Sequence, residues 1–485
     1  MDYDVLIIGG GISGTTIARQ LCRYQLRVAL LEKEVDVSFG VSKANSGIVH
    51  AGFHEKPGTV KSQLCARGNF LYEQYAQELG FPFRRCGILT VAMDDDEQLQ
   101  QLELLYHQGL KNGVPYLQII SGERAREMEP NLSPDVRQAI YAPTGAIVEP
   151  YEMIFAIVEN AQKNGLAVFT SAKAEAFEPI DGGLRVITGE HSFTARFVIN
   201  AAGLYADEVS RLAGAEEFRI VPRKGEEYLL DKRAGSLVNS VIFPVPSKKS
   251  KGILVIPTVA GTLMIGPTAL EIDDKEDRAT TSKGLQQVFE QVRSLVPDVQ
   301  LKDIITAFVG LRPSMAGDDF YIGRSEKVPA LIQVAAIQSP GLTSAPAIAE
   351  MVKNILLHAG LQLVENPNFG PYRPREKKLR QLNLPELDQI ITENPAYARV
   401  VCRCEKVSEA EVVHAIRLGH TTLDGIKLAT RCGMGRCQGG FCTYRVMEII
   451  SRETGMSYDQ ITKRGGGSYL VKGKLESQGI ALKTT

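Results

Sequence analysis

Apolar and polar positions follow clear periods in the first 32 residues of this chain. Apolar runs at 5–8 and 28–31 are typical of buried strands, and apolar residues between them recur at helical spacing. A glycine cluster at 9–14 separates the first run from the helical pattern, and Glu32 follows the second run. The pattern therefore predicts a strand, a tight turn, a helix and a second strand that ends at an acidic residue.

The same two periods recur further along the chain and predict mixed α and β structure. Helical periods predict helices over 60–80, 96–112 and 151–164. Apolar runs predict strands over 87–92, 167–170, 194–200 and 331–337. The last of these strands leads through Ser339, Pro340 and Gly341 into a helix, whose N-terminus can face an anionic or electron-rich group. Residues 216–330 alternate apolar and polar positions between glycine turns, which is typical of antiparallel strands.

The glycine cluster is typical of a dinucleotide-binding turn. Gly9, Gly11 and Gly14 satisfy G-x-G-x-x-G, in which the glycines allow a tight turn, close approach to a pyrophosphate and close helix packing. The helix N-terminus offers free N–H groups and a positive dipole end to phosphates. Glu32 is placed to accept hydrogen bonds from a ribose, and Gly203, after a buried strand, also allows close approach of the backbone to a nucleotide. Together these features indicate a nucleotide site.

Composition indicates a soluble globular protein with more than one domain. The 485 residues exceed what one hydrophobic core holds, and 44% of them are hydrophobic. A formal net charge of −1 gives no broad attraction to nucleic acid or anionic membranes. No apolar run reaches the roughly 18 residues that span a bilayer, and the first residues do not resemble a signal peptide. We therefore expect a cytoplasmic protein, with any membrane association made peripherally through a partner.

Two histidines are candidates for chemistry beside the nucleotide. His50 and His54 lie at the end of a Gly-, Ser- and Asn-rich segment, 38–54, that follows the strand carrying Glu32. This position brings them near the strand ends, where a cofactor binds, and His50 is the preferred catalytic candidate. Their i, i+4 spacing would also suit a metal pair, but no third ligand accompanies them.

Arg312 is a candidate for binding an anionic substrate. It lies at the end of an apolar strand, where an unpaired charge is costly. A guanidinium is planar, permanently charged and bidentate toward carboxylate or phosphate, so a buried one favours an anion clamp. The alternative is an internal ion pair with Asp318 or Asp319.

Five of the eight cysteines gather near the C-terminal end and predict a metal centre rather than disulfides. They form a C-x-C pair and a later C-x4-C-x4-C run: Cys402, Cys404, Cys432, Cys437 and Cys442. Helices are predicted between them over 408–418, with Ser408 as N-cap, and over 422–430. Zinc sites favour C-x2-4-C, so zinc fits this spacing poorly. A connector with five prolines, 361–398, precedes the cluster.

On these residues the chain resembles two known families. Residues 1–360 resemble FAD-dependent oxidoreductases of the D-amino-acid oxidase type, closest to flavin glycerol-3-phosphate dehydrogenases and oxidases and to the related L-2-hydroxyglutarate dehydrogenases. This resemblance rests on GGGISG with Glu32 and on the segments at 45–54, 198–207, 310–314 and 339–347. The cysteine segment resembles the [2Fe–2S] domain of the bacterioferritin-associated ferredoxin type, which is often appended to glycerol-3-phosphate dehydrogenase subunits.

The resemblance implies an α/β fold in which a Rossmann-like FAD-binding domain carries an inserted, mainly antiparallel β-sheet substrate domain. A small helical [2Fe–2S]-binding domain follows. The expected FAD-binding segments are 1–80, 145–215 and 331–362. The expected substrate-domain segments are 81–144 and 216–330, followed by a linker at 363–398, the [2Fe–2S] domain at 399–460 and a tail at 461–485.

The resemblance also implies roles for particular residues. The expected FAD contacts are Gly9, Gly11, Ser13, Gly14, Glu32, Asn45, Ser46, Gly47, Gly203, Gly341, Leu342 and Thr343. His50 would be the base beside the flavin and Arg312 the anion clamp. Ser339 and Lys251 would be further substrate contacts, with Lys248 and Lys249 as competing lysines. The expected cluster ligands are Cys402, Cys404, Cys437 and Cys442, while Cys432 is a spare thiol or replaces Cys442 in a pair with Cys437.

These expectations describe a flavin dehydrogenase. It would oxidise glycerol 3-phosphate to dihydroxyacetone phosphate and pass electrons through a [2Fe–2S] centre to an acceptor protein or partner subunit. A 2-hydroxy acid such as L-2-hydroxyglutarate is the alternative substrate. A further alternative is an electron-transfer subunit that has no substrate of its own.

Overall fold

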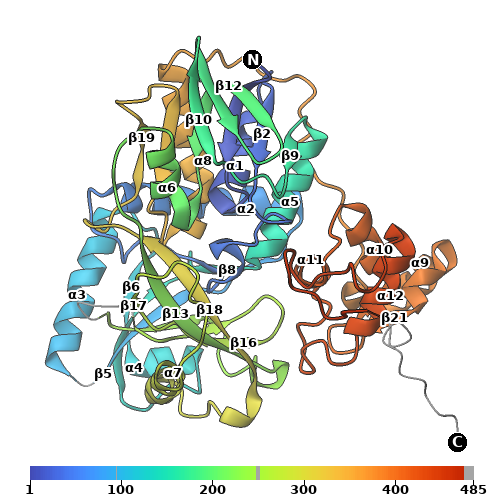
Figure 1. The fold of residues 1–485 in the computed structure, drawn as a ribbon. Helices are drawn as coiled ribbons and strands as arrows, with labels where there is room; N and C mark the ends of the chain where they lie inside the picture. The colour runs from blue at the N-terminus through green and yellow to red at the C-terminus, as the bar shows by residue number, and fades with distance from the viewer. Residues whose placement is uncertain (94, 247–251, 474–485) are drawn as a thin grey trace, which may run out of the picture. The chain divides into compact units, whose positions relative to one another are not determined.

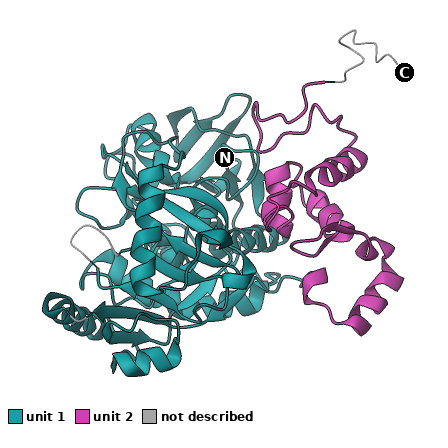
Figure 2. Ribbon diagram, turned by 90° about the horizontal axis from the view of Figure 1, so that it is seen from below, with its two compact units in different colours: residues 1–374 teal, residues 375–485 magenta. Residues whose placement is uncertain are grey.

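The structure is a computed structural model that describes residues 1–93, 95–246 and 252–473. It divides into two compact units, Met1–Pro374 and Arg375–Thr485, which are coloured separately in Figure 2. The expected substrate contact Lys251, like Lys248 and Lys249, lies outside the described residues. None of the described helices is both long enough and apolar enough to cross a membrane.

The first unit contains a mixed sheet, drawn in the upper part of Figure 1, in which β1 (Tyr3–Ile8) lies between two parallel neighbours. β1 pairs in parallel with β2 on one edge and with β12 on the other, and the end of β12 pairs with β20. The strands of this sheet after β1 are β2 (Val28–Leu31), β9 (Ala167–Phe169), β10 (Ala176–Ile180), β11 (Gly183–Ile187), β12 (Ser192–Asn200), β19 (Tyr321–Arg324) and β20 (Leu331–Ala335). Four residues at the end of β1 are buried, as a strand covered on both faces requires.

The helix that follows β1 depends on two glycines. Gly9 has φ +111°, and a Cβ on Gly14 would lie 2.0 Å from the Gly9 carbonyl oxygen, so a side chain there would push α1 away from β1. The helices of this region are α1 (Ile12–Leu21), α2 (Val60–Leu79), α5 (Pro150–Lys163), α6 (Ala206–Leu212) and α8 (Gly341–His358). α1 packs against α5 and α8, and α2 also packs against α8.

A second, mainly antiparallel sheet forms the rest of the first unit. Its strands are β5 (Ile88–Met93), β6 (Gln118–Ser121), β7 (Val136–Ala142), β13 (Val221–Leu230), β14 (Val241–Pro244), β15 (Leu254–Pro257), β16 (Leu263–Gly266), β17 (Leu270–Glu271) and β18 (Ile304–Ser314). A smaller sheet contains β3 (Ile48–Val49), β4 (Phe83–Arg85) and β8 (Ala146–Val148). The register of the long β13–β18 pair places Arg223 opposite Arg312 and Gly225 opposite Gly310.

Helices α3 (Asp96–Lys111), α4 (Gly122–Met128) and α7 (Ser282–Leu295) pack on strands of the second sheet. The strand-rich pattern over 216–330 did not predict α7. Its apolar residues, Val288, Val292 and Leu295, recur at helical spacing and pack into the same core as β13, β15 and β16. Short 3₁₀ helices in this unit are η1 (Val41–Lys43), η2 (Gly203–Tyr205), η3 (Lys232–Ala234) and η4 (Leu301–Asp303).

The second unit is small and mostly helical. Its elements are η5 (Leu379–Gln381), α9 (Leu384–Glu393), η6 (Pro395–Ala398), β21 (Val400–Cys402), β22 (Val407–Ser408), α10 (Glu409–Arg417), α11 (Leu423–Thr430) and α12 (Thr443–Thr454). Ser408 caps α10 in a capping box with Glu411, which confirms the predicted N-cap. The range predicted as a proline-rich connector contains α9, which begins with a capping box between Asn383 and Glu386.

Candidate active site and cysteine centre

A cavity of about 650 Å³ lies in the first unit. Its lining includes the carboxyl ends of β1, β2 and β20 and residues of β13 and β18. Open α/β sheets bind ligands at the carboxyl ends of their parallel strands. The cavity brings together most of the predicted site residues, which are Gly9, Gly11, Ser13, Glu32, Asn45, Ser46, Gly47, His50, Gly203, Arg312, Ser339, Gly341 and Leu342.

Two residues predicted to contact the cofactor do not line this cavity. Gly14 packs against the Gly9 carbonyl, so its role is in the junction of α1 with β1. Thr343 is fully buried, and its Oγ1 accepts a hydrogen bond from the His50 N–H at 2.9 Å. His54, the second histidine candidate, is also outside the lining, and its ring packs at a tilt against the rings of Phe53 and Phe243. These three residues lie behind the cavity wall and do not line it.

Glu32 fixes the glycine turn at the nucleotide end of the cavity. Its Oε2 accepts a hydrogen bond from the Gly10 N–H at 2.7 Å, and its Oε1 accepts one from the Glu34 N–H at 2.9 Å. Burial raises the pKa of Glu32, and the two backbone N–H groups oppose that shift. Each carboxylate oxygen keeps a second lone pair that a ribose hydroxyl can use.

The N-terminus of α1 opens onto the cavity without a side-chain cap. The Ile12 N–H donates to Ser42 Oγ at 3.0 Å, a contact that the sequence pattern did not predict. At Gly203, which has φ +58°, a Cβ would meet no atom within 4 Å. An anion-accepting helix end, an acidic ribose acceptor and open space beside glycine backbone together fit the phosphates and ribose of FAD.

The loop before His50 is shaped by its own side chains. Asn45 Nδ2 donates to the Ser42 carbonyl at 2.7 Å, and Asn45 Oδ1 accepts from the Gly47 N–H at 2.9 Å. Gly47 has φ +63°, and a Cβ there would lie 2.5 Å from the Val148 carbonyl oxygen. The asparagine and the glycine therefore set the path of the chain into β3, where it leads to His50.

His50 is held by contacts from two helices. Its N–H donates to Thr343 on α8, and its carbonyl oxygen accepts from Asn69 Nδ2 on α2 at 2.9 Å. The imidazole Nε2 lies 3.4 Å from Ser339 Oγ, and the ring makes an edge contact with Phe243 at 5.9 Å between centroids. The side chain thus lies at the cavity wall beside the N-terminus of α8.

Arg312 makes no ion pair with Asp318 or Asp319, so the structural alternative for this residue was wrong. Its Nη2 donates to the Thr268 carbonyl at 2.6 Å and to one carbonyl of β13, and its Nε donates to another. Asp318 pairs instead with Lys61 at 3.2 Å. Burial lowers the pKa of Arg312 to about 10. Within the described ranges Nη1 makes no hydrogen bond, which leaves a donor of this cation for a ligand.

Glu227 also lines the cavity and was not predicted from the sequence. Its side chain is buried, and Oε1 accepts a hydrogen bond from Ser46 Oγ at 3.3 Å. Among the described residues, Oε2 has no hydrogen-bond partner. Burial raises the pKa of Glu227 to about 7, although Arg312 and Ser46 both act to lower it. The sequence could have indicated this position, because Arg223, Gly225 and Glu227 are alternate residues of one strand and therefore share one face.

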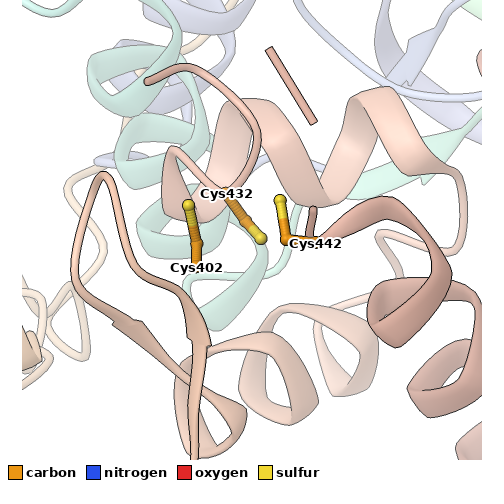
Figure 3. A group of neighbouring side chains, drawn as sticks. All are labelled: Cys402, Cys432 and Cys442. Carbon is orange, nitrogen blue, oxygen red and sulfur yellow. The ribbon is translucent and has the colours of Figure 1, made fainter. Parts of the chain in front are cut away.

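The five clustered cysteines lie in the second unit in two groups. The Sγ atoms of Cys402, Cys432 and Cys442 lie within 4.8 Å of one another and are carried by β21, the loop after α11 and the start of α12 (Figure 3). The Sγ atoms of Cys404 and Cys437 are 3.8 Å apart.

The first three thiols are buried and the other two are exposed. A Cβ on Gly435 would lie 2.2 Å from Cys404 Cβ, so this loop requires a glycine. Gathered thiolates with neighbouring glycine N–H groups are the donor set of an iron–sulfur cluster. Cys432 lies beside two of the predicted ligands, and the choice of four ligands stays a prediction.

Comparison with known protein families agrees with both sites. Residues 4–355 match the family described as FAD dependent oxidoreductase. Residues 400–452 match the BFD-like [2Fe-2S] binding domain. The predicted family resemblance, α/β fold class and two cofactors are thereby confirmed.

Individual relatives point in the same direction. The chain is 44% identical to a glycerol 3-phosphate dehydrogenase from Caloramator mitchellensis, over 98% of this chain and 99% of the relative. A solved L-alpha-glycerophosphate oxidase from Mycoplasma pneumoniae with FAD bound has a TM-score of 0.74 and 30% identity, over 77% of this chain and 99% of that one. A human mitochondrial L-2-hydroxyglutarate dehydrogenase is 28% identical, over 72% of this chain and 88% of the relative.

Proposed function

This chain belongs to the FAD dependent oxidoreductase family, and we propose that it oxidises sn-glycerol 3-phosphate to dihydroxyacetone phosphate. The observation that carries the proposal is the 44% identity to a glycerol 3-phosphate dehydrogenase over nearly the whole of both chains. The cavity supports it, because a cation with an unused donor, a histidine and a nucleotide-binding end line one space. These are the groups that oxidation of a phosphorylated alcohol requires.

His50 takes the proton of the C2 hydroxyl group. An imidazole ring nitrogen can accept a proton from a hydroxyl group, which is the role of a general base. Thr343 and Asn69 hold the backbone of His50 on both sides, and Ser339 Oγ lies 3.4 Å from Nε2. A base fixed in this way contributes by being aligned before the substrate arrives.

Arg312 binds the phosphate group. Backbone carbonyls hold its guanidinium through Nε and Nη2, so the side chain is oriented without a neutralising carboxylate in contact. A charged donor in a largely buried cavity attracts a phosphate more strongly than it would in water. Ser339 and Lys251 are further substrate contacts in this proposal.

The two cofactors supply the redox chemistry. When bound, FAD would supply a two-electron acceptor for the hydride of C2, and the [2Fe–2S] cluster would supply one-electron transfer. Gly9, Gly11, Ser13 and Glu32 would hold the nucleotide half of FAD, and Asn45, Ser46, Gly47, Gly203, Gly341 and Leu342 line the rest of the cavity. Cys402, Cys404, Cys437 and Cys442 would hold the cluster.

The second unit favours a dehydrogenase that delivers electrons to an acceptor protein or partner subunit. The relative that covers 98% of this chain is named a dehydrogenase, whereas the FAD-bound oxidase covers 77% of it. An iron–sulfur domain serves no purpose if oxygen takes both electrons directly from the flavin. Peripheral attachment to a membrane through that partner belongs to the same proposal.

Anaerobic reduction of the flavin tests the substrate. The purified protein is mixed without oxygen with glycerol 3-phosphate, L-2-hydroxyglutarate, sarcosine or proline, and bleaching of the oxidised flavin band is followed. Rapid bleaching by glycerol 3-phosphate alone is expected. Faster bleaching by L-2-hydroxyglutarate would favour the 2-hydroxy acid alternative, which the 28% identical relative supports. An unbleached flavin with every substrate would favour an electron-transfer subunit.

A further inference from the structure

The part of the cavity that is lined by β13 and β18 carries two side chains of opposite charge. Arg312 on β18 and Glu227 on β13 both line the cavity, with Gly225 between them along β13. A Cβ on Gly225 would lie 2.9 Å from Arg312 Nη2, so the guanidinium occupies the space above this glycine. Glu227 is two residues beyond Gly225 on the same face of β13, which places their Cα atoms about 7 Å apart. A three-carbon chain with a phosphate at one end bridges such a distance.

We propose that Glu227 is a specificity-determining residue whose carboxyl group hydrogen-bonds the C1 hydroxyl of a glycerol phosphate and excludes substrates with a carboxylate at C1. The proposal rests on glycerol 3-phosphate as substrate and adds which residue distinguishes it from a 2-hydroxy acid. In this arrangement Arg312 binds the phosphate on C3, His50 acts at C2 and Glu227 contacts C1.

The hydrogen bonding of Glu227 leaves one position open for a ligand. Ser46 Oγ donates to Oε1, whereas Oε2 is buried and has no hydrogen-bond partner among the described residues. A buried polar atom without a partner is costly, so a residue kept in this state at a cavity wall indicates a missing partner. A hydroxyl group suits this position in either protonation state, because it can donate to a carboxylate or accept from a carboxylic acid.

A carboxylate at C1 is disfavoured here by like charge. Two carboxylates that share a buried site repel each other unless one of them binds a proton. Glycerol 3-phosphate has a hydroxymethyl group at this carbon, whereas a 2-hydroxy acid has a carboxylate. The side chain therefore rejects the second class without a steric barrier, which is a repulsive element of specificity.

The expected pH dependence separates Glu227 from the other charged groups of the cavity. Arg312 faces it from β18, Arg223 lies on its own strand, and His50 lines the cavity beyond β3. Burial raises the pKa of Glu227 to about 7. Discrimination against a C1 carboxylate should therefore strengthen as pH rises from 6 to 8 and Glu227 ionises. Because both substrates carry a phosphate and enter the same cavity, a ratio between them cancels the pH effects that they share.

The test compares three substrates with the same configuration at C2 by anaerobic stopped-flow reduction of the FAD-loaded protein. They are sn-glycerol 3-phosphate, its 1-deoxy analogue and glycerate 3-phosphate. The measured quantity is the rate constant of flavin reduction divided by the dissociation constant of the substrate. In the wild type it should be at least about 10-fold higher for sn-glycerol 3-phosphate than for the 1-deoxy analogue. Glu227→Leu should bring this ratio close to 1. Glu227→Gln should retain most of it, because an amide still bonds a hydroxyl group, and should use glycerate 3-phosphate at least about 10-fold better than wild type.

Glu226→Gln is the matched control. Glu226 is the neighbouring residue on β13 and equally buried, but its carboxylate accepts hydrogen bonds from Thr281 N–H and Oγ1 and does not line the cavity. It should keep the wild-type ratios and their pH dependence. In Glu227→Gln the preference for glycerol 3-phosphate over glycerate 3-phosphate should no longer change between pH 6 and 8.

Two results would overturn the inference. One is a Glu227→Leu variant that prefers glycerol 3-phosphate over its 1-deoxy analogue as strongly as the wild type does. The other is a Glu227→Gln variant whose preference for glycerol 3-phosphate over glycerate 3-phosphate changes with pH as in the wild type. If the leucine variant does not fold with FAD, the glutamine pH profile decides alone. Failure of wild type to be reduced by glycerol 3-phosphate is a different outcome, because it would overturn the proposed function itself.

Discussion

In the cavity of the first unit the predicted FAD contacts come from backbone groups and side chains of separate segments, from Gly9 to Leu342. In the cysteine centre they come from thiols alone, within residues 402–442 of the second unit. The first arrangement shares the binding energy among many weak contacts. The second concentrates it in a few strong bonds to metal.

This difference predicts how each site responds to the loss of one side chain. Removing one contact from a distributed site should cost a fraction of the affinity, on the order of 1.5–3 kcal/mol for a charge-assisted hydrogen bond. Removing one thiolate from a four-thiolate cluster should remove the cluster, because the metal loses a ligand that serine does not replace well. Substitutions in the two units therefore test the comparison directly.

The largest effect is expected from the cysteine ligands. Cys437→Ser and Cys402→Ser should abolish the visible absorption of the [2Fe–2S] cluster while the flavin spectrum remains. Cys432→Ser is the matched control and should keep the cluster. Loss of the cluster in the Cys432 variant would contradict the ligand set, and zinc in place of iron and sulfide by elemental analysis would contradict electron transfer.

A large effect on rate, without loss of either cofactor, is expected from His50→Asn. Asparagine retains much of the size and hydrogen bonding of histidine but is no base, and removal of a general base costs about 10²–10⁴-fold in rate. Anaerobic stopped-flow reduction by glycerol 3-phosphate measures this loss. His54→Asn should retain most of the wild-type rate, since His54 lies behind the cavity wall. Wild-type reduction by His50→Asn would make His54 the next candidate.

Arg312→Leu should chiefly weaken apparent substrate affinity. Loss of one partner from a buried, hydrogen-bonded charge pair costs about 2–5 kcal/mol, and the clamp acts in ground state and transition state alike. The dependence of flavin reduction on substrate concentration separates binding from the limiting rate. Arg312→Lys should recover part of the affinity, because it restores the charge without the planar fork. If the leucine variant needs the same glycerol 3-phosphate concentration for half-maximal reduction as the wild type, Arg312 does not bind the phosphate.

The smallest of these effects is expected from Glu32→Ala. The ribose loses a charge-assisted acceptor worth about 1.5–3 kcal/mol, and the glycine turn loses the hydrogen bond from Gly10 to Oε2. FAD should then be lost on extensive dialysis, while the [2Fe–2S] absorption remains. Glu32→Gln, which keeps one acceptor oxygen, should lose less FAD. Full retention of FAD by the alanine variant would refute this role of Glu32.

Sequence alone predicted the parts of each site that are encoded locally. The β1–α1–β2 unit depends on glycine positions and apolar periods within some thirty residues, so its strands, turn and acid could be recognised directly. Ser408 was likewise recognisable as the N-cap of α10 because a capping box is local.

Features that depend on pairing between distant strands were not predicted. Glu227 enters the cavity only because the β13–β18 register brings its face toward the loop that holds Ser46. The partners of Arg312 are carbonyl oxygens, which leave no mark in the sequence, so an ion pair with Asp318 or Asp319 was a reasonable alternative. Helix α7 was hidden because its surroundings are rich in strands.

The wide separation of the cavity segments along the chain has a thermodynamic consequence. A ligand that touches both the end of β1 and the start of α8 binds only the folded unit. FAD held by the predicted contacts would therefore act as a non-covalent cross-link between distant parts of the chain. Such a ligand adds about 2.7 kcal/mol to stability when its free concentration is 100 times its dissociation constant. The melting temperature of the first unit should therefore rise with added FAD and fall on dilution. In a cell with scarce flavin, the amount of folded enzyme would then follow the supply of its cofactor.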